Sequence, residues 1–218
     1  MFQIVKNVLD AEALGRVLAQ IDAAPFVDGR ATAKGMAQSV KRNTQIDRDA
    51  FPELTRTLTR LVGEHPVVAA LAMPKRITPV RIARYEPGME YGYHSDNAVI
   101  DGVRTDLSFT LFLAEPQGYD GGELALQTPI GEAKIKPPAG HLVLYDTGAV
   151  HRVMPVTRGA RLVAVGWVQS RIRDARQREI VIDLERMRSD YLARHGHDAH
   201  ADLLLKTSTN LQRMWSEV

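Results

Sequence analysis

Residues 161–170 read RLVAVGWVQS, a short run dominated by Val, Leu and Trp. Residues 106–115 (DLSFTLFLAE) and 141–146 (HLVLYD) have the same character. Short runs rich in β-branched and aromatic residues, bounded by turn residues, are typical of β-strands. Four more of them are ITPVRIARY (77–85), GELALQT (122–128), EAKIKP (132–137) and HRVMPV (151–156). Because Gly, Pro, Asp and Asn separate these runs, residues 75–170 predict a β-sandwich or barrel.

Helical spacing dominates the region before these strands. A short strand in 2–9 precedes Asp10, which is a plausible N-cap for a helix through about Ala23. Apolar residues recur at helical spacing again over 51–62. The polar stretch 28–48 between the two predicts an irregular loop or a lid. We expect residues 1–74 to form a support region for the β-domain at 75–170.

Helical spacing also returns at the C-terminal end. Beyond Asp174 the apolar residues fall on one stripe, and a break near His195-Gly196 precedes a second helix that carries Trp215. We therefore expect residues 171–218 to form a helical extension that packs on the β-domain or on a second copy of the chain. The three histidines at 195, 197 and 200 are expected in a solvated break, and Trp167 is expected in the core.

The composition restricts the possible chemistry. The chain of 218 residues contains no cysteine, which excludes disulfides and thiolate metal sites, so nitrogen and oxygen atoms must hold any metal. The formal net charge of +2 is too small to favour nucleic acid as a partner. Since no signal peptide is recognisable at the start and no apolar run approaches about 20 residues, we expect a cytoplasmic protein without membrane contact.

One short motif suggests a metal site. In an extended chain the side chains of His94 and Asp96 point to the same side, and His151 is the best candidate for a third ligand. Two histidines and one carboxylate form the facial set that suits non-haem Fe(II), whereas zinc more often has a closed set of four ligands or three ligands and water. Against this interpretation, most His-x-Asp motifs lie in surface turns.

Arg161 strengthens the hypothesis of a site. Residues 155–159 are typical of a hairpin turn, and pairing across it would place His151 and Arg161 on one inner face. A guanidinium on a face of valines is costly unless an anion accompanies it, and its planar fork suits a carboxylate. An internal salt bridge, to Asp146 or Glu123, explains the same residue equally well.

Taken together, the motifs resemble a known family. Tyr85-x-x-Gly88-x-x-Tyr91-x-x-His94-x-Asp96 and His151-x-x-x-Pro155-Val156-x-x-Gly159-x-Arg161 are similar to the two signature motifs of prolyl 4-hydroxylase-like 2-oxoglutarate oxygenases. The match covers about residues 78–169, and the whole chain looks like the bacterial PKHD-type hydroxylases. The basic residue is Arg here, where animal prolyl hydroxylases of this group often have Lys.

The resemblance implies a jelly roll, or double-stranded β-helix. It implies Fe(II) at His94, Asp96 and His151, and 2-oxoglutarate held by Arg161 through its distal carboxylate. Tyr85 would donate a hydrogen bond to that carboxylate, and Tyr91 would line the substrate side. The expected reaction is hydroxylation of a peptide or small molecule, with O₂ as oxidant and succinate and CO₂ as co-products. Family members are described as binding L-ascorbate (vitamin C), and some are linked to iron uptake.

Two other functions compete with a hydroxylase. A non-catalytic jelly-roll module could sense iron or 2-oxoglutarate, but simple metal binding needs neither Arg161 nor Tyr85. A nucleic-acid demethylase would use the same chemistry, but the low net charge and the lack of stacking aromatic residues argue against it. The sequence does not identify the substrate or the oligomeric state.

Overall fold

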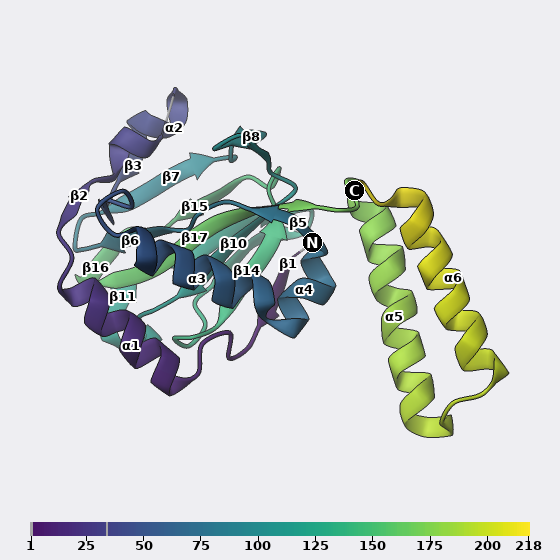
Figure 1. Cartoon of the computed structure of the whole chain (residues 1–218). Helices are drawn as coiled ribbons and strands as arrows, with labels where there is room; N and C mark the ends of the chain where they lie inside the picture. The colour runs from purple at the N-terminus through teal and green to yellow at the C-terminus, as the bar shows by residue number, and fades with distance from the viewer. Residues whose placement is uncertain (1, 34) are drawn as a thin grey trace.

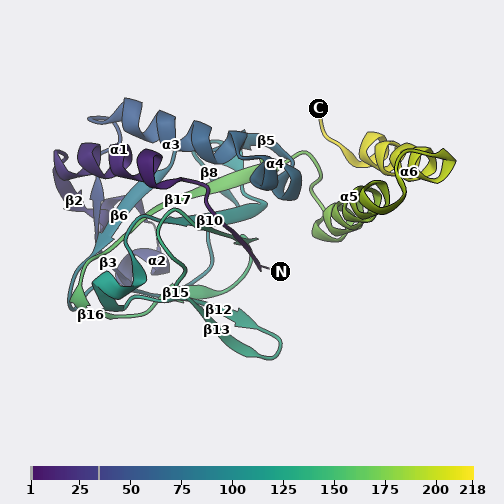
Figure 2. The ribbon, with the colours of Figure 1, turned by 90° about the horizontal axis from the view of Figure 1, so that it is seen from below.

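A computed structural model describes residues 2–33 and 35–218, which form two large antiparallel sheets that face each other, two small two-stranded sheets, and helices on the outside (Figures 1 and 2). The larger sheet contains β1 (Phe2–Val5), β14 (Leu142–Asp146), β10 (Leu107–Phe112), β17 (Arg161–Ser170), β6 (Arg81–Tyr85), β4 (Thr44–Ile46) and β2 (Phe26–Asp28) in that order, with β5 (Pro74–Ile77) beside β17. The smaller sheet contains β13 (Gly131–Ile135), β12 (Leu124–Thr128), β15 (His151–Val153), β7 (Glu90–His94) and β3 (Lys41–Arg42). This mainly β architecture with a jelly-roll core confirms the predicted fold class.

The outer face of the larger sheet is covered by three helices: α1 (Ala11–Asp22), α3 (Pro52–Glu64) and α4 (Pro66–Ala72) (Figure 2). The Asp10 carboxylate accepts a hydrogen bond from the Ala13 amide at 2.8 Å, so the predicted N-cap is confirmed. The remaining short elements are η1 (Gly29–Thr32), α2 (Met36–Ser39), β8 (Val99–Ile100), β9 (Val103–Arg104), η2 (Pro116–Gly118), β11 (Tyr119–Gly121) and β16 (Val156–Gly159).

Alternation along the central strands divides the core into two layers. On β17, Leu162, Ala164 and Val168 belong to the cluster under the helices. Val163 belongs to the second cluster, between the sheets, where it joins Phe112 and Tyr145 of the larger sheet and Leu124 of the smaller one. Because side chains of a strand point alternately to its two faces, Arg161, Val163, Val165 and Trp167 of β17 face the space between the sheets.

The predicted hairpin between His151 and Arg161 is wrong. β15 pairs with β12 and β7, whereas β17 pairs with β10, β6 and β5, so the two residues lie in different sheets. The intervening residues form β16, which pairs with β11. Gly159 has φ 68°, and a Cβ there would lie 2.1 Å from the Gly118 carbonyl oxygen, so the chain turns at a point that only glycine fits.

The prediction of an irregular loop over 28–48 is also wrong. The described residues of this stretch include β3, which joins the smaller sheet, and β4, which joins the larger one. Lys34 lies outside the described residues. The stretch therefore connects the two sheets at one edge of the sandwich, and whether it moves as a lid stays a prediction.

The C-terminal extension forms a helical hairpin that projects from the sandwich (Figure 1). Its helices are α5 (Ala175–His195) and α6 (Ala199–Trp215). Gly196 is the C-cap of α5, and α6 begins three residues later. The chain returns to the sandwich at its end, where the Glu217 carboxylate accepts a hydrogen bond from Arg104 at 2.7 Å. Among the described residues, no helix combines the length and apolarity that a membrane span requires.

Candidate functional site

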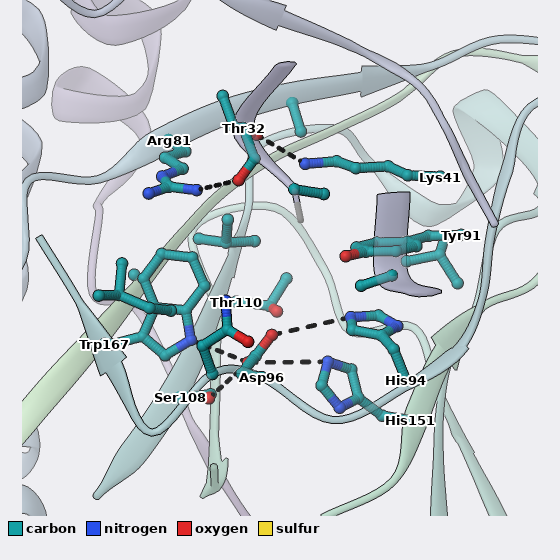
Figure 3. A pocket seen from close by; sticks show the side chains of 18 of the residues that line it. Thr32, Lys41, Arg81, Tyr91, His94, Asp96, Ser108, Thr110, His151 and Trp167 are labelled. Atoms are coloured by element: carbon teal, nitrogen blue, oxygen red, sulfur yellow. Dashed lines mark hydrogen bonds and ion pairs between the residues drawn. The ribbon is translucent and has the colours of Figure 1, made fainter. Parts of the chain in front are cut away.

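A cavity of about 210 Å³ opens between the two sheets. It is lined by side chains from β6, β7, β10, β15 and β17, and by the segment that follows β7. All six residues that the sequence singled out line this cavity: Tyr85, Tyr91, His94, Asp96, His151 and Arg161. Figure 3 shows three of them, His94, Asp96 and His151, converging on one another.

Strand pairing brings the two histidines together. His94 ends β7, His151 begins β15, and the two residues are direct partners in the register of these strands. Their ring centroids lie 4.3 Å apart. Asp96 follows two residues after His94, with one carboxylate oxygen 3.7 Å from His94 Nε2 and the other 3.9 Å from His151 Nε2. One ligand atom from each residue falls within 4.8 Å of the others, so the three side chains form a group that could hold a metal ion.

Backbone carbonyl groups fix which ring nitrogen of each histidine carries the proton. Nδ1 of His94 donates to the Gly92 carbonyl oxygen at 2.8 Å, and Nδ1 of His151 donates to the Ala149 carbonyl oxygen at 2.9 Å. A carbonyl only accepts, so each Nδ1 carries the proton and each Nε2 presents a lone pair to the centre of the group. Burial, and then the neighbouring His151, lower the pKa of His94 to about 4, which keeps its ring neutral at physiological pH.

Two donors orient the Asp96 carboxylate. Ser108 Oγ and Trp167 Nε1 each donate to the same oxygen, Oδ2, at 2.8 Å. The other oxygen, Oδ1, receives no hydrogen bond from the described residues. The carboxylate is therefore held from one side and leaves Oδ1 available to a cation, as expected for ligands that are oriented by their own neighbours.

These two orienting residues were not identified from the sequence. Trp167 was expected only in the core, and it is indeed 7% exposed, but its indole N–H reaches the site. The signal was present in the alternation along β17, because Trp167 has the same parity as Arg161. Ser108 gave no comparable signal within the run DLSFTLFLAE.

Arg161 lies at the inner end of the cavity with unused donors. Its side chain is 1% exposed, and Nε and Nη1 have no hydrogen-bond partner among the described residues. The predicted alternative, a salt bridge to Asp146 or Glu123, does not form, and Asp146 instead lies 3.4 Å from Arg178. A buried guanidinium with unpaired N–H groups is costly, which indicates a place prepared for an anion.

Aromatic side chains surround this guanidinium and the histidines. Tyr85 is the direct partner of Arg161 across β6 and β17, and the guanidinium carbon lies 5.0 Å from the Tyr85 ring centroid. Burial raises the pKa of the Tyr85 hydroxyl, so it remains a hydrogen-bond donor. Tyr91 stacks on His94 with centroids 3.6 Å apart and an interplanar angle of 17°. The cavity thus has a buried guanidinium beside Tyr85 and an aromatic wall at Tyr91.

The other histidines take no part in the site. His197 contacts Asp202 at 2.7 Å and His200 contacts Asp198 at 3.4 Å, all at the exposed break between α5 and α6. Within residues 2–33 and 35–218, His94, Asp96 and His151 form the only group that satisfies the geometric requirement for a metal site.

Comparison with known proteins assigns the family. Residues 80–169 match the family model of the 2OG-Fe(II) oxygenase superfamily. The chain is 44% identical to a PKHD-type hydroxylase of Picosynechococcus sp., with all of both chains covered, and 42% identical to one of Maricaulis maris, with 98% of both covered. The crystal structure of a Pseudomonas putida prolyl-4-hydroxylase is similar over 78% of this chain and 92% of that one, with 26% identity and a TM-score of 0.53.

The matched region contains Arg161 and the three residues that could hold a metal ion, His94, Asp96 and His151, which are called the metal-binding group below. Iron and 2-oxoglutarate are the cofactor and co-substrate that this superfamily implies, and O₂ is the oxidant. The chain belongs to the PKHD-type hydroxylase family within the 2OG-Fe(II) oxygenases, and it is a 2-oxoglutarate-dependent dioxygenase.

Proposed function

We propose that this protein hydroxylates a peptide or a small molecule with Fe(II) held by His94, Asp96 and His151. Arg161 binds the distal carboxylate of 2-oxoglutarate, and Tyr85 donates a hydrogen bond to the same group. The observation that carries the proposal is the combination, in one cavity, of the three convergent ligand atoms with a buried guanidinium that has unpaired donors. Neither feature alone distinguishes an oxygenase from a metal-binding module.

The donor set fits the metal. Two neutral imidazoles and one carboxylate are ligands that Fe(II) accepts, and three protein ligands leave further positions for a co-substrate and O₂. The carbonyl groups behind both histidines fix their orientation, and Ser108 and Trp167 fix that of Asp96. The protein therefore holds its ligand atoms in place before the metal arrives.

The cavity also fits 2-oxoglutarate. This molecule has a carboxylate at each end, and the metal ion and the Arg161 guanidinium supply one positive charge site for each end. When bound, iron and 2-oxoglutarate supply an oxidative decarboxylation that consumes O₂ and yields succinate and CO₂. The chain itself positions 2-oxoglutarate through Arg161 and Tyr85, and it excludes water with the apolar residues between the sheets. Tyr91 lines the side from which the substrate approaches.

Anaerobic titration tests this assignment. Addition of Fe(II) and 2-oxoglutarate to the protein is expected to give a visible metal-to-ligand charge-transfer band, and admission of air to give slow release of succinate. Arg161→Gln should abolish the band at low 2-oxoglutarate concentrations, while the matched control Arg158→Gln, at an exposed arginine, should preserve it. Failure of the wild-type protein to give either the band or succinate would contradict the proposal.

Several expectations from the sequence stay predictions. These are stimulation by L-ascorbate, a link to iron uptake, the division of the chain at residues 74 and 170, and association of two copies through the C-terminal helices. For the last, the apolar side chains of Ile180, Met187 and Leu203 are about half exposed on the helical hairpin. Analytical ultracentrifugation of the protein with and without residues 171–218 tests it.

A further inference from the structure

A buried lysine lies in the cavity and has no acidic partner. Lys41, on β3, is 5% exposed, and its Nζ donates to Thr32 Oγ1 at 2.8 Å. No carboxylate of the described residues lies within 4.0 Å of Nζ. Its register partner is Tyr91, whose ring centroid is 5.3 Å from Nζ. An ammonium group that is buried with one hydroxyl acceptor retains unused donors, so it is poorly compensated in this structure.

Arg81 brings a second cation to the same place. Its Nη1 donates to the Thr32 carbonyl oxygen at 3.0 Å, and its guanidinium carbon lies 5.1 Å from the Trp167 ring centroid. Among the described residues, its acidic contact within 4.0 Å is Asp101, at 3.5 Å, and that carboxylate already pairs with Arg48 at 2.5 Å. Thr32 therefore connects Arg81, through its carbonyl group, with Lys41, through its hydroxyl group.

The two cations lie across the cavity from the metal-binding group. In Figure 3, Lys41 and Arg81 approach Thr32 from two sides, while His94, Asp96 and His151 lie together on the opposite side. All of them line the same cavity. The space between them is where a substrate must lie if the proposed function holds, because Arg161 and Tyr85 occupy a separate end beside the second core cluster.

The lowered pKa of Lys41 reflects the cost of burying its charge near Arg81. Burial, and then the positive charge of Arg81, lower its pKa to about 8. Asp96 and Asp28 oppose this shift, but a bound metal would neutralise much of the Asp96 charge. Lys41 still carries its proton at neutral pH, so the protein maintains two neighbouring cations whose repulsion an incoming anion would relieve.

We propose that Lys41 and Arg81 form an oxyanion clamp that binds a carboxylate or phosphate group of the substrate, and that the substrate is therefore an acidic molecule. This inference rests on the proposed function, because it takes the metal and 2-oxoglutarate to occupy the other parts of the cavity. The clamp sets the orientation of the substrate: its acidic group lies at Thr32, and the carbon to be hydroxylated points toward the metal-binding group. It also defines a role for residues 29–46, which supply Thr32 and Lys41.

Binding of matched small probes tests the clamp. The protein, loaded anaerobically with Fe(II) and 2-oxoglutarate, is titrated by calorimetry with benzoate, phenyl phosphate and benzamide, which share a phenyl group and differ in the head group. We expect at least one anion to bind about tenfold or more tightly than the neutral amide, since hydrogen bonds to charged groups are the stronger ones. Benzoate against phenyl phosphate distinguishes a carboxylate from a phosphate as the preferred group.

Variants test whether Lys41 and Arg81 cause the preference for an anion over the amide. Lys41→Met and Arg81→Gln should each reduce the preference for the anion to about threefold or less, while the matched control Lys206→Met, at an exposed lysine of α6, should leave it unchanged. The charge-transfer band, measured in each variant, shows that the fold and the 2-oxoglutarate site are intact. A variant that loses the band is set aside, and the other variant decides.

Three results would overturn the clamp. They are equal binding of all three probes to the wild-type protein, an unchanged preference in both variants, and loss of the charge-transfer band when the anion binds, which would place the anion at Arg161. Failure of the proposed function gives a different result, namely no band in the wild-type protein before any probe is added. In that case the comparison of anion with amide is made without cofactors on the Arg161→Gln variant, which lacks the other buried guanidinium of the cavity, and it still tests the clamp.

Discussion

The indole of Trp167 is expected to control the affinity for iron. Its Nε1 donates to Asp96 Oδ2 at 2.8 Å, and Trp167→Phe removes this donor while it retains most of the ring. A hydrogen bond to a charged acceptor contributes about 1.5–3 kcal/mol. At about 1.4 kcal/mol for each factor of ten, its loss corresponds to a roughly 10- to 100-fold weaker Fe(II) complex. Loss of a partner that orients a metal ligand typically has an effect of the same size.

Ser108 provides a second test of the same carboxylate oxygen. Its hydroxyl donates to the same carboxylate oxygen, so Ser108→Ala should weaken Fe(II) binding in the same direction. Because the two donors share one acceptor, the double variant should differ from the sum of the single variants. The Kd of Fe(II) is measured anaerobically by competition with a chelator, with Trp215→Phe as control and the melting temperature recorded for each protein. Fe(II) affinity of Trp167→Phe within twofold of wild type, in a folded protein, would refute this role.

Three further predictions follow from the same structure. Arg161→Met should abolish 2-oxoglutarate binding. It should leave the melting temperature of the metal-free protein unchanged or higher, because a buried guanidinium with unpaired donors is removed. A large decrease in this melting temperature would argue against the reasoning. Asp174 and Asp198 cap α5 and α6 with pKa values lowered to about 2, so the stability they provide is complete above their ordinary pKa near 4 and lost as pH falls toward 2. Helicity by circular dichroism should decrease over this range, and the decrease should be smaller in the double Asn variant. Gly159→Ala should lower the free energy of unfolding by about 1–3 kcal/mol in urea titrations, whereas Gly148→Ala, with open space and ordinary φ, should change it by less than about 1 kcal/mol.

The strands could be predicted from the sequence because their signal is local. Seven runs between 77 and 170 had the composition and length of strands, and each overlaps a strand of the structure. Their pairing could not be predicted in the same way. A turn such as 155–159 is compatible with a hairpin and with a crossing between sheets, and only contacts with distant segments decide between them. The erroneous hairpin followed from this limit.

The residues of the cavity also divide into those that local sequence could place and those that only strand pairing places. His94 and Asp96 are close in the chain, so extended geometry suffices to place them on one side. His151 joins them through strand register, which the sequence does not encode locally. Lys41 escaped notice because the stretch 28–48 has no periodicity from which burial could be inferred, and its strand is defined only by pairing with β7. Polar segments that become ordered through their partners are the places where sequence patterns carry least information.

The central strand β17 explains how Arg161 reaches the same cavity as His151 although the predicted hairpin is wrong. Arg161, Val165 and Trp167 share one parity, so a single strand delivers to the cavity the cation at its inner end and the donor that orients Asp96. The position of Arg161 relative to Trp167 is then set by the rise of one regular strand, about 3.3 Å for each residue, and not by a flexible loop. A shift of one residue in the pairing of β17 would turn both side chains toward the helices. Metal affinity and 2-oxoglutarate affinity should therefore be lost together in any variant that disturbs this register.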